Sequence, residues 1–254
     1  SRFSVDDLYN RYLDAGNGGT ASNTGTGSDW NLASEFAKIN YSFASKYLVD
    51  LTMRRDRSSR FAEEFRTAYF PSVSAGWRLS QEGFMSGFTF LNDLKLRAGW
   101  GKTGNQEIGN YNPYTQYGTD PRTSFYDLNG SRNASLQGYE LIQFGNPRAK
   151  WETTTSVNAG LDATLLGNKL EVSFDWYTRE TTDMLFPVEV QLTHGIAINP
   201  FQNIGTMSNK GIDLAMNYNS TAMKGALTFN IGVNFSTYRN NVIRTDGNPN
   251  TRYF

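Results

Sequence analysis

The sequence has no cysteine and a single histidine among its 254 residues. The absence of cysteine excludes disulfides, thiolate catalysis and thiolate metal sites, and it leaves the redox compartment open. The one histidine, His194, stands in the run QLTHGIAINP with no nearby partner for a catalytic triad or a metal cluster. We therefore predict that the chain is not an enzyme and that it holds no metal and no cofactor.

Two further absences concern net charge and long apolar runs. Lys and Arg number 24, as do Asp and Glu, so no bulk charge favours nucleic acid or an anionic membrane surface as a partner. No apolar run approaches the roughly 20 residues that a membrane-spanning helix needs. The start SRFSVDD has neither an initiator Met nor a signal peptide, and from it we expect an internal or processed piece of a longer chain.

What the sequence does have is many aromatic rings, 14% of its residues, in a chain of mean hydropathy −0.53. The stretch NYSFASKYLVDLTMRRDRSSRF, residues 40–61, shows their arrangement. Apolar and polar residues alternate on both sides of a tight connection at 44–46, which predicts two strands with one apolar face each. Six more segments alternate in the same way, at 72–79, 94–101, 151–162, 170–176, 212–218 and 227–236, so we predict eight strands.

The predicted connectors alternate in length. Short links lie at 44–46, 165–169 and 219–225, with a middling one at 80–93, and long links lie at 55–69, 102–149 and 178–210. Structureless loops beyond about 12 to 15 residues are uncommon in globular domains. Outer-membrane barrels instead combine short periplasmic turns with long outer loops. All the long links fall on one side of an up-and-down sheet, as such a barrel requires.

Large rings mark the two ends of the apolar face. In up-and-down order, the outer ends carry Trp100, Trp151 and Trp176, and the inner ends carry Phe43, Tyr47, Trp77 and Tyr218. The residues between them are mostly aliphatic. Two aromatic belts around an aliphatic band favour lipid on this face.

The opposite face carries charges that we predict to face water in a lumen: Lys38, Asp50, Arg54, Arg78, Lys95, Arg97, Glu152, Asp162, Glu171, Asp175 and Asp213. Eight strands could close a small barrel, but its interior would be filled by side chains. The inward charge and the long loops favour a wider barrel with a wet or plugged interior, of which this chain would supply a part. A soluble β-sandwich presents the same alternation and stays open as an alternative.

Five runs of the sequence carry a family resemblance. They are residues 40–61, quoted above, FPSVSAGWRLSQEGFM (70–85), FLNDLKLRAGWGKTGNQEIGNY (90–111), WETTTSVNAGLDATLLGNKLEVSFDWYTRETTDML (151–185) and NIGTMSNKGIDLAMNY (203–218). Together they cover most of residues 36–240 and resemble the barrel of a SusC/RagA-type TonB-dependent transporter, with GNQEIGNY and NKGIDL as the most specific elements.

The resemblance implies an all-β fold: a transmembrane antiparallel up-and-down β-barrel of about 22 strands, of which about eight are present here. It assigns residues 1–254 to part of a TonB-dependent receptor β-barrel domain, with the plug domain, the TonB-contacting box and the remaining strands absent. It also implies a SusD-like surface lipoprotein as a lid, and energy passed from the inner membrane through TonB. The ending RTDGNPNTRYF has a terminal Phe but no alternating strand before it, so we expect a cut within a loop.

Substrate contacts are expected from the long outer loops. Tyrosine rings there could stack on sugars or pack against a peptide, and amides could donate and accept hydrogen bonds. The candidates are Asn105, Gln106, Asn110, Tyr111, Tyr114, Tyr117 and Tyr126. Packing within the loops, or docking of the lid lipoprotein, accounts for the same residues equally well.

Two other motifs have ordinary explanations. The run GWGKTGNQ lacks both the Walker spacing and the following helix of a phosphate-binding loop, so we expect its glycines to let a strand end turn. The basic cluster Arg54, Arg55, Arg57 and Arg60 could meet an anionic substrate or a lipid headgroup, but we expect solvated rim charges that pair locally.

We therefore predict a multi-pass β-barrel segment of a bacterial outer-membrane nutrient importer. It would serve TonB-dependent uptake of oligosaccharides or peptides together with a SusD-like lipoprotein. A passive porin or surface adhesin on the same barrel, and a soluble carbohydrate-binding β-sandwich, are the alternatives.

Overall fold

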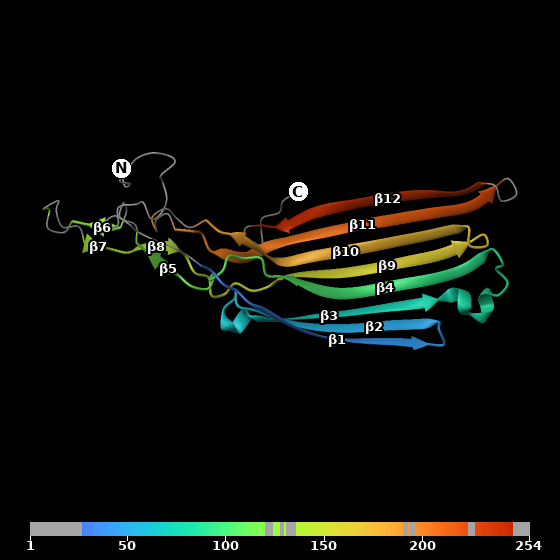
Figure 1. Ribbon diagram of the computed structural model, residues 1–254, viewed down its shortest axis with the longest axis horizontal. Coiled ribbons are helices and arrows are strands. Elements are labelled where there is room, and N and C mark those ends of the chain that lie inside the picture. Colours follow the sequence, from blue (N-terminus) through green and yellow to red (C-terminus); the bar gives the residue numbers. More distant parts are fainter. Residues whose placement is uncertain are drawn as a thin grey trace, which may run out of the picture.

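Eight long strands form one antiparallel sheet in the order β1-β2-β3-β4-β9-β10-β11-β12 (Figure 1). The computed structural model describes residues 27–119, 124–127, 130, 136–189, 193, 197–222 and 227–245. The strands are β1 Leu32–Phe43, β2 Tyr47–Ser58, β3 Thr67–Arg78, β4 Leu91–Asn105, β9 Glu152–Leu165, β10 Leu170–Pro187, β11 Phe201–Ala222 and β12 Leu227–Arg244. The predicted eight-stranded up-and-down sheet is confirmed. No helix in the described ranges is long and apolar enough to cross a membrane.

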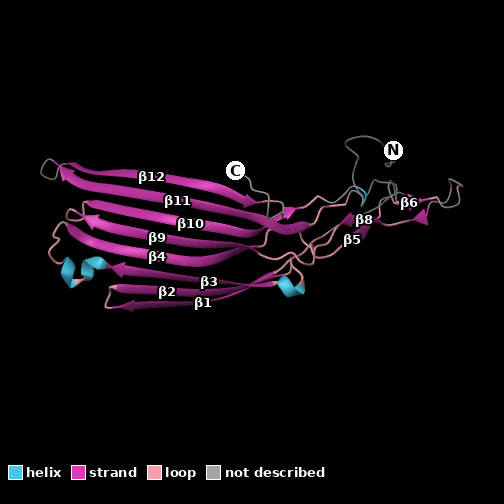
Figure 2. Cartoon of the chain, turned by 180° about the vertical axis from the view of Figure 1, so that it is seen from behind, coloured by secondary structure: helices cyan, strands magenta, loops and turns pink. Residues whose placement is uncertain are grey.

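One end of the sheet carries the short connections. Ala44 and Ser45 have φ angles of 51° and 55°, and the N–H of Lys46 donates to the carbonyl of Phe43 at 3.0 Å. Positive φ at both central residues is what a tight hairpin turn with the twist of its strands requires. The link from β3 to β4 at this end contains two short 3-10 helices, η5 Leu79–Gln81 and η6 Gly83–Met85 (Figure 2).

The other end carries the long connections. The 3-10 helix η4 (Glu63–Phe65) lies between β2 and β3. Two small hairpins lie in the link between β4 and β9, where β5 (Gln116–Gly118) pairs with β8 (Glu140–Gln143) and β6 (Phe125–Tyr126) pairs with β7 (Leu136–Gln137). These hairpins project beyond the end of the main sheet (Figures 1 and 2).

The strands run further toward this end than the alternation predicts. The links predicted at 55–69 and 178–210 are 59–66 and 188–200, because β2, β3, β10 and β11 all extend. Backbone pairing of β10 with β11 continues from Thr178 opposite Lys210 to Pro187 opposite Phe201. Side chains in this extension are largely polar on both faces, which removes the alternation without removing the strand.

The register places the apolar residues on one face of the sheet, called here the apolar face. Residues opposite each other on paired strands share a face, and one row runs through Phe43, Tyr47, Trp77, Leu96, Leu161, Phe174, Leu214 and Phe235. This row starts at the β1–β2 turn but ends eight residues into β12, which begins at Leu227.

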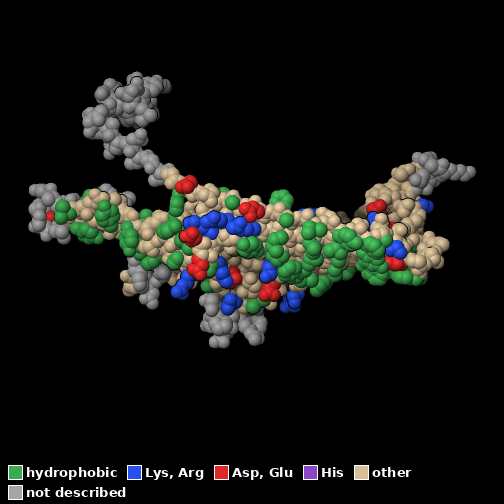
Figure 3. All heavy atoms as spheres, turned by 90° about the horizontal axis from the view of Figure 1, so that it is seen from below, with side chains coloured by type: hydrophobic (Ala, Val, Ile, Leu, Met, Phe, Trp, Pro, Cys, Tyr) green, Lys and Arg blue, Asp and Glu red, His purple; other side chains and the backbone are tan. Residues whose placement is uncertain are grey.

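The apolar face is exposed over a continuous area. Ile39 is 64% exposed, and Phe235 is 54% exposed, although both are large hydrophobic side chains. Figure 3 shows hydrophobic side chains gathered in a band along the sheet, with charged side chains between the band and the loop end. So large an exposed apolar area is typical of a surface that meets something other than water.

A stacked row of rings closes the short-turn end of the apolar face. Tyr47 lies between Phe43 and Trp77, with ring centroids 6.4 Å apart on each side. Glu82, in the β3–β4 link, accepts hydrogen bonds from the Tyr47 hydroxyl at 2.7 Å, the Trp77 indole at 3.2 Å and the Lys46 ammonium at 3.1 Å. The Tyr47 hydroxyl first, then the indole and the ammonium, hold the pKa of Glu82 below its ordinary value. The carboxylate therefore fixes the edge of the ring row.

A small buried cluster lies at the loop end, and it corrects the role predicted for Trp151. The cluster consists of Phe61, Phe70, Ile108, Ala149 and Trp151. Trp151 is 6% exposed, its ring lies 5.4 Å from that of Phe61, and its indole N–H donates to the carbonyl of Arg66 at 3.0 Å. The prediction that Trp151 belongs to an outer aromatic belt is wrong, because its ring packs the loops together. Trp100 and Trp176 do lie on the apolar face, 38% and 43% exposed.

Candidate functional site

The face opposite the apolar one, called here the polar face, collects the charges singled out in the sequence. Asp50 stands opposite Asn40 and Ser74, Lys95 opposite Arg78 and Asp162, and Asp175 opposite Asp213. By the same registers, Lys38, Arg54, Arg97, Glu152 and Glu171 lie on this face too. Charged residues of neighbouring strands therefore lie side by side, and together they form one charged surface across the sheet.

Arg97 is the centre of this surface. Its guanidinium Nη2 donates to Asp162 Oδ1 at 2.9 Å and to Asp175 Oδ2 at 3.0 Å, and its Nε lies 2.7 Å from Asp162 Oδ2. The Ser173 hydroxyl also donates to Asp162, at 2.9 Å. One cation thus holds two carboxylates from β9 and β10, and charge-assisted bonds of this kind are the strong ones.

A glycine on the neighbouring strand lets the Arg97 side chain extend across the sheet. Gly160 is the register partner of Arg97 on β9. A Cβ on Gly160 would overlap a carboxylate oxygen of Asp175 and lie 3.0 Å from Cζ of Arg97. Without a side chain at Gly160, the guanidinium can pass over β9 and reach β10. Sequence analysis missed this role, although the run NAGLD places Gly160 among the inward residues.

Carboxylates outnumber cations in the row that contains Arg97. Asp213 stands directly opposite Asp175 and accepts a hydrogen bond from the Ser236 hydroxyl at 2.6 Å. Like charges opposite each other on paired strands disfavour the sheet unless water or a cation lies between them. The centre of the polar face is therefore suited to contact with water and with cationic or hydrogen-bonding groups.

The polar face also has shallow hollows. One of about 460 Å³ lies between β9 and β12, with Asp162, Glu171, Asn217 and Asn234 among its lining residues. Gly232 contributes to its depth, since an added Cβ there would meet nothing closer than Asn217 Oδ1 at 3.8 Å. Polar hollows of this kind hold water or accept side chains from a neighbouring element.

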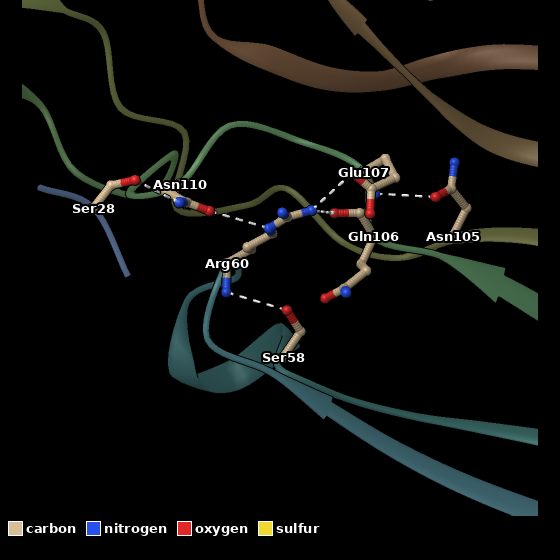
Figure 4. Close-up of polar contacts among 7 residues, drawn as sticks. All are labelled: Ser28, Ser58, Arg60, Asn105, Gln106, Glu107 and Asn110. Carbon is tan, nitrogen blue, oxygen red and sulfur yellow. Dashed lines mark hydrogen bonds and ion pairs between the residues drawn. The ribbon is translucent and has the colours of Figure 1, made fainter. Parts of the chain in front are cut away.

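At the loop end, Arg60 holds several segments together (Figure 4). Its Nε donates to Asn110 Oδ1 at 3.1 Å, and its Nη1 lies 3.0 Å from Glu107 Oε2 and donates to the carbonyl of Gln106 at 3.4 Å. The guanidinium also stacks 4.4 Å above the ring of Trp30. The side chain is 11% exposed, so this cation is a structural junction of three loop segments.

The candidate residues of the run GNQEIGNY are used within the protein. The Asn110 amide donates to Ser28 at 3.2 Å while its oxygen accepts from Arg60. The Tyr111 hydroxyl donates to Asp29 at 2.6 Å, and Gln106 is 8% exposed. Asn105 accepts from the N–H of Glu107 at 3.0 Å and its amide donates to Glu152 at 3.4 Å. These contacts hold the loop in place, so the side chains that we expected to bind substrate are bonded within the protein.

The other three candidate rings are open to solvent. Tyr114, Tyr117 and Tyr126 are 56%, 66% and 53% exposed, and two of them lie on the projecting hairpins. The structure therefore separates the predicted set: the part next to β4 is tied into the loop junction, and the tyrosines further out are free to contact a partner or a substrate.

The basic cluster predicted at the end of β2 divides into separate ion pairs. Arg54 pairs with Asp56 at 2.7 Å, Arg55 pairs with Glu35 at 3.0 Å, and Arg60 joins the loop junction. Arg54 and Arg55 point to opposite faces because they are adjacent in a strand. The expected local pairing of solvated charges is confirmed for Arg54 and Arg55, whereas Arg60 is largely buried in the loop junction.

Within the described ranges, no group of three or more His, Cys, Asp or Glu side chains could hold a metal ion. His194 and the C-terminal run 246–254 lie outside the described residues.

Comparison with known proteins agrees with this architecture. Residues 2–253 match the family described as TonB dependent receptor-like, beta-barrel. The chain is 35% identical over 213 residues to TonB-dependent receptor P3 of Formosa agariphila, covering 84% of this chain and 20% of that protein. It is 33% identical over 228 residues to TonB-dependent receptor SusC of Bacteroides thetaiotaomicron, covering 88% of this chain and 22% of that protein.

Solved structures give the same result. The RagAB peptide importer in its closed-closed state superposes with a TM-score of 0.75 at 30% identity, over 86% of this chain and 23% of that one. The siderophore receptor PirA from Pseudomonas aeruginosa, at 13% identity and a TM-score of 0.51 over 84% of this chain and 35% of that one, shares the fold. The chain spans about a fifth of the length of the curated relatives it matches.

Proposed function

The chain belongs to the TonB-dependent receptor β-barrel family, and we propose that its residues 1–254 form part of the barrel wall of a nutrient importer. Members of this family are receptors and transporters of the bacterial outer membrane, and the chain is an outer-membrane protein of the SusC/RagA-like kind. In the proposed arrangement the apolar face meets lipid and the polar face lines the lumen.

The segregation of the two faces carries the proposal. The apolar row from Phe43 to Phe235 is unbroken over all eight strands, and the Arg97 network lies on the opposite side of the same strands. A barrel in lipid needs this arrangement, with an outward apolar band and a polar interior. A soluble sandwich would need a second sheet over the exposed band.

The proposed reaction is binding and gated passage without covalent chemistry. Energy would come through TonB by way of a plug domain, and a SusD-like lipoprotein would close the outer opening. Similarity to the TonB-dependent receptor SusC supports these partners, and similarity to the RagAB peptide importer supports a peptide as one of the two candidate substrate classes. Exposed rings such as Tyr117 and Tyr126 are suited to either substrate, since a ring can stack on a sugar or pack against a peptide.

Energy dependence of uptake tests this proposal. Cells that carry the full-length protein are given fluorescent oligosaccharides or oligopeptides, with and without a protonophore that removes the proton gradient. We expect uptake of one substrate class, and we expect the protonophore to abolish it. Uptake that continues unchanged without the gradient would identify a passive porin instead.

The tyrosine contacts are tested in the same assay. Replacing Tyr117 and Tyr126 together by alanine should raise the substrate concentration needed for half-maximal uptake by roughly tenfold, because each stacked ring contributes about 0.5–1.5 kcal/mol. Tyr69→Ala is the matched control, since Tyr69 is also 60% exposed but lies on the apolar face. If Tyr69→Ala reduced uptake equally, the loss would be due to impaired folding and not to lost substrate contacts.

A further inference from the structure

On several strands the apolar face changes from hydrophobic to polar at a similar distance from the short turns. Arg55, Lys102, Thr178 and Lys210 are the first polar residues beyond the band on β2, β4, β10 and β11. Arg55, Thr178 and Lys210 each lie eight residues from the ring or leucine nearest the turn on the same strand, which is Tyr47, Leu170 or Tyr218. On β4, Lys102 lies eight residues from Leu94. Eight residues span about 26 Å along a strand, or roughly 20 Å when the strand is inclined by about 40°. These residues therefore stand at the far edge of the apolar band.

A hollow opens at this level between β10, β11 and β12. It has a volume of about 550 Å³, and its lining consists of Ile243 and the polar residues Thr178, Glu180, Ser208, Lys210, Arg239 and Asn241. The six polar side chains share the apolar face. Lys210 stands opposite Thr178 and Arg239, and Ser208 stands opposite Glu180 and Asn241. The hollow thus lies on the outside of the sheet, directly beyond Trp176 and Ile212.

The two cations of the hollow form no ion pair within the described part of the chain, although the carboxylate of Glu180 lines the same hollow. Lys210 and Arg239 are direct cross-strand neighbours, both are exposed, and neither forms an ion pair among the described residues. Like charges in this position disfavour the pairing of their strands. Hydroxyl and amide donors from Thr178, Ser208 and Asn241 surround them. Two cations with hydroxyl and amide donors are the chemical partners of a phosphate group.

We propose that this hollow binds the phosphate of a lipid headgroup in the outer leaflet. The occupant follows from position: the apolar band below the hollow meets lipid tails, so the headgroup of the same lipid lies at the level of Lys210 and Arg239. The hollow lies toward the long connections, and in outer-membrane barrels these are on the cell exterior. This site rests on the lipid-facing arrangement proposed above, and it is independent of the substrate and of the energy source.

Glu180 provides a second test of the site, because its carboxylate lines the same hollow. A negative charge there opposes a phosphate, so a lipid site predicts opposite effects when the two kinds of charge are removed. Neutralising the cations should weaken binding, and Glu180→Gln should strengthen it.

The experiment measures lipid binding to the full-length protein in detergent by native mass spectrometry. The probes are lipid A that carries its phosphates and the same lipid after phosphatase treatment. We expect the phosphorylated form to bind at least tenfold more tightly, and the double variant Lys210→Gln/Arg239→Gln to lose that preference. Equal binding of both lipids, or an unchanged preference in the double variant, overturns the proposal.

Two controls keep the result unambiguous. Lys38→Gln/Arg78→Gln removes two cations from the polar face and should leave lipid binding unchanged; an equal loss would make the effect one of net charge and overturn the site. Millimolar inorganic phosphate should not displace the lipid, and full displacement would show a site for a free anion instead. Heat-modifiable migration on gels verifies folding, and the single change Arg239→Gln, at an exposed position, serves if the double variant fails to fold.

Discussion

Placing an arginine at Leu161 tests which face of the sheet meets lipid. Leu161 stands opposite Leu96 and Phe174 on the apolar face. Along β9 it lies four residues from Val157, at the outer end of the apolar run, and four from Leu165, at the turn end. Four residues span about 13 Å along a strand, so Leu161 is at the middle of the band.

The expected cost follows from that depth. An arginine at the middle of a lipid-facing strand costs about 2–4 kcal/mol, since the guanidinium must leave water. Thr164→Arg, three residues away on the polar face, is the matched control. Thr164 stands opposite Glu171 and Asp93, so an arginine there gains two carboxylates and keeps its water. We expect that variant to change stability by less than about 1 kcal/mol.

The measurement is guanidinium unfolding of the full-length protein folded into lipid vesicles, followed by tryptophan fluorescence. The free energy of unfolding should fall for Leu161→Arg and stay nearly constant for Thr164→Arg. Equal losses at the two positions, or a larger loss at Thr164, would refute the assignment of lipid to the apolar face.

Three further predictions concern the Arg97 network, the ring row and the loop junction. Gly160→Val should lower the free energy of unfolding by about 1–3 kcal/mol, because the valine side chain would overlap the ion pairs that cross this position. Gly232→Val is the control, since Gly232 has open space around it, and it should have little effect in the same unfolding assay. Glu82 has a folded-state pKa below its ordinary 4.5, so its contribution is present above that pH and is lost as pH falls through the lower, folded value. The stability difference between wild type and Glu82→Gln should therefore shrink as pH falls below about 4.5, and a difference that stays constant with pH would contradict this. Arg60→Ala should speed proteolytic cleavage in the loop after β4, and Arg57→Ala, a nearby cation outside the junction, should not.

The sequence was enough to predict the eight strands and the face on which each residue lies. The reason is that a period of two is easily read wherever one face is apolar and the other is wet, as between Tyr47 and Met53. Where both faces are wet the period disappears, so the outer halves of β10 and β11 were predicted as loop. Ladder hydrogen bonds, rather than side-chain contrast, define a strand there.

The candidate site was harder to predict because its parts meet only in three dimensions. Trp151 follows the pattern of a belt ring in sequence, but Phe61 from the β2–β3 link and Phe70 from β3 cover it. From the sequence, Asn110 and Tyr111 were predicted to be free to bind a substrate. In the structure they bond to Ser28 and Asp29, each 82 residues away in the sequence. Long-range partners of this kind leave no periodic signal in one sequence.

The apolar row from Phe43 to Phe235 shifts steadily along the strands from β1 to β12. The row begins at the β1–β2 turn and reaches Phe235 eight residues above the start of β12, while the short turns gather at one end of the sheet (Figure 1). A climb of about 26 Å over seven strand spacings of about 4.8 Å inclines the strands by roughly 38°. Residues at the same depth in the membrane therefore do not lie in one hydrogen-bonded row. They lie along a helical path around the barrel wall that crosses these rows and passes from Arg55 through Lys102 to Lys210.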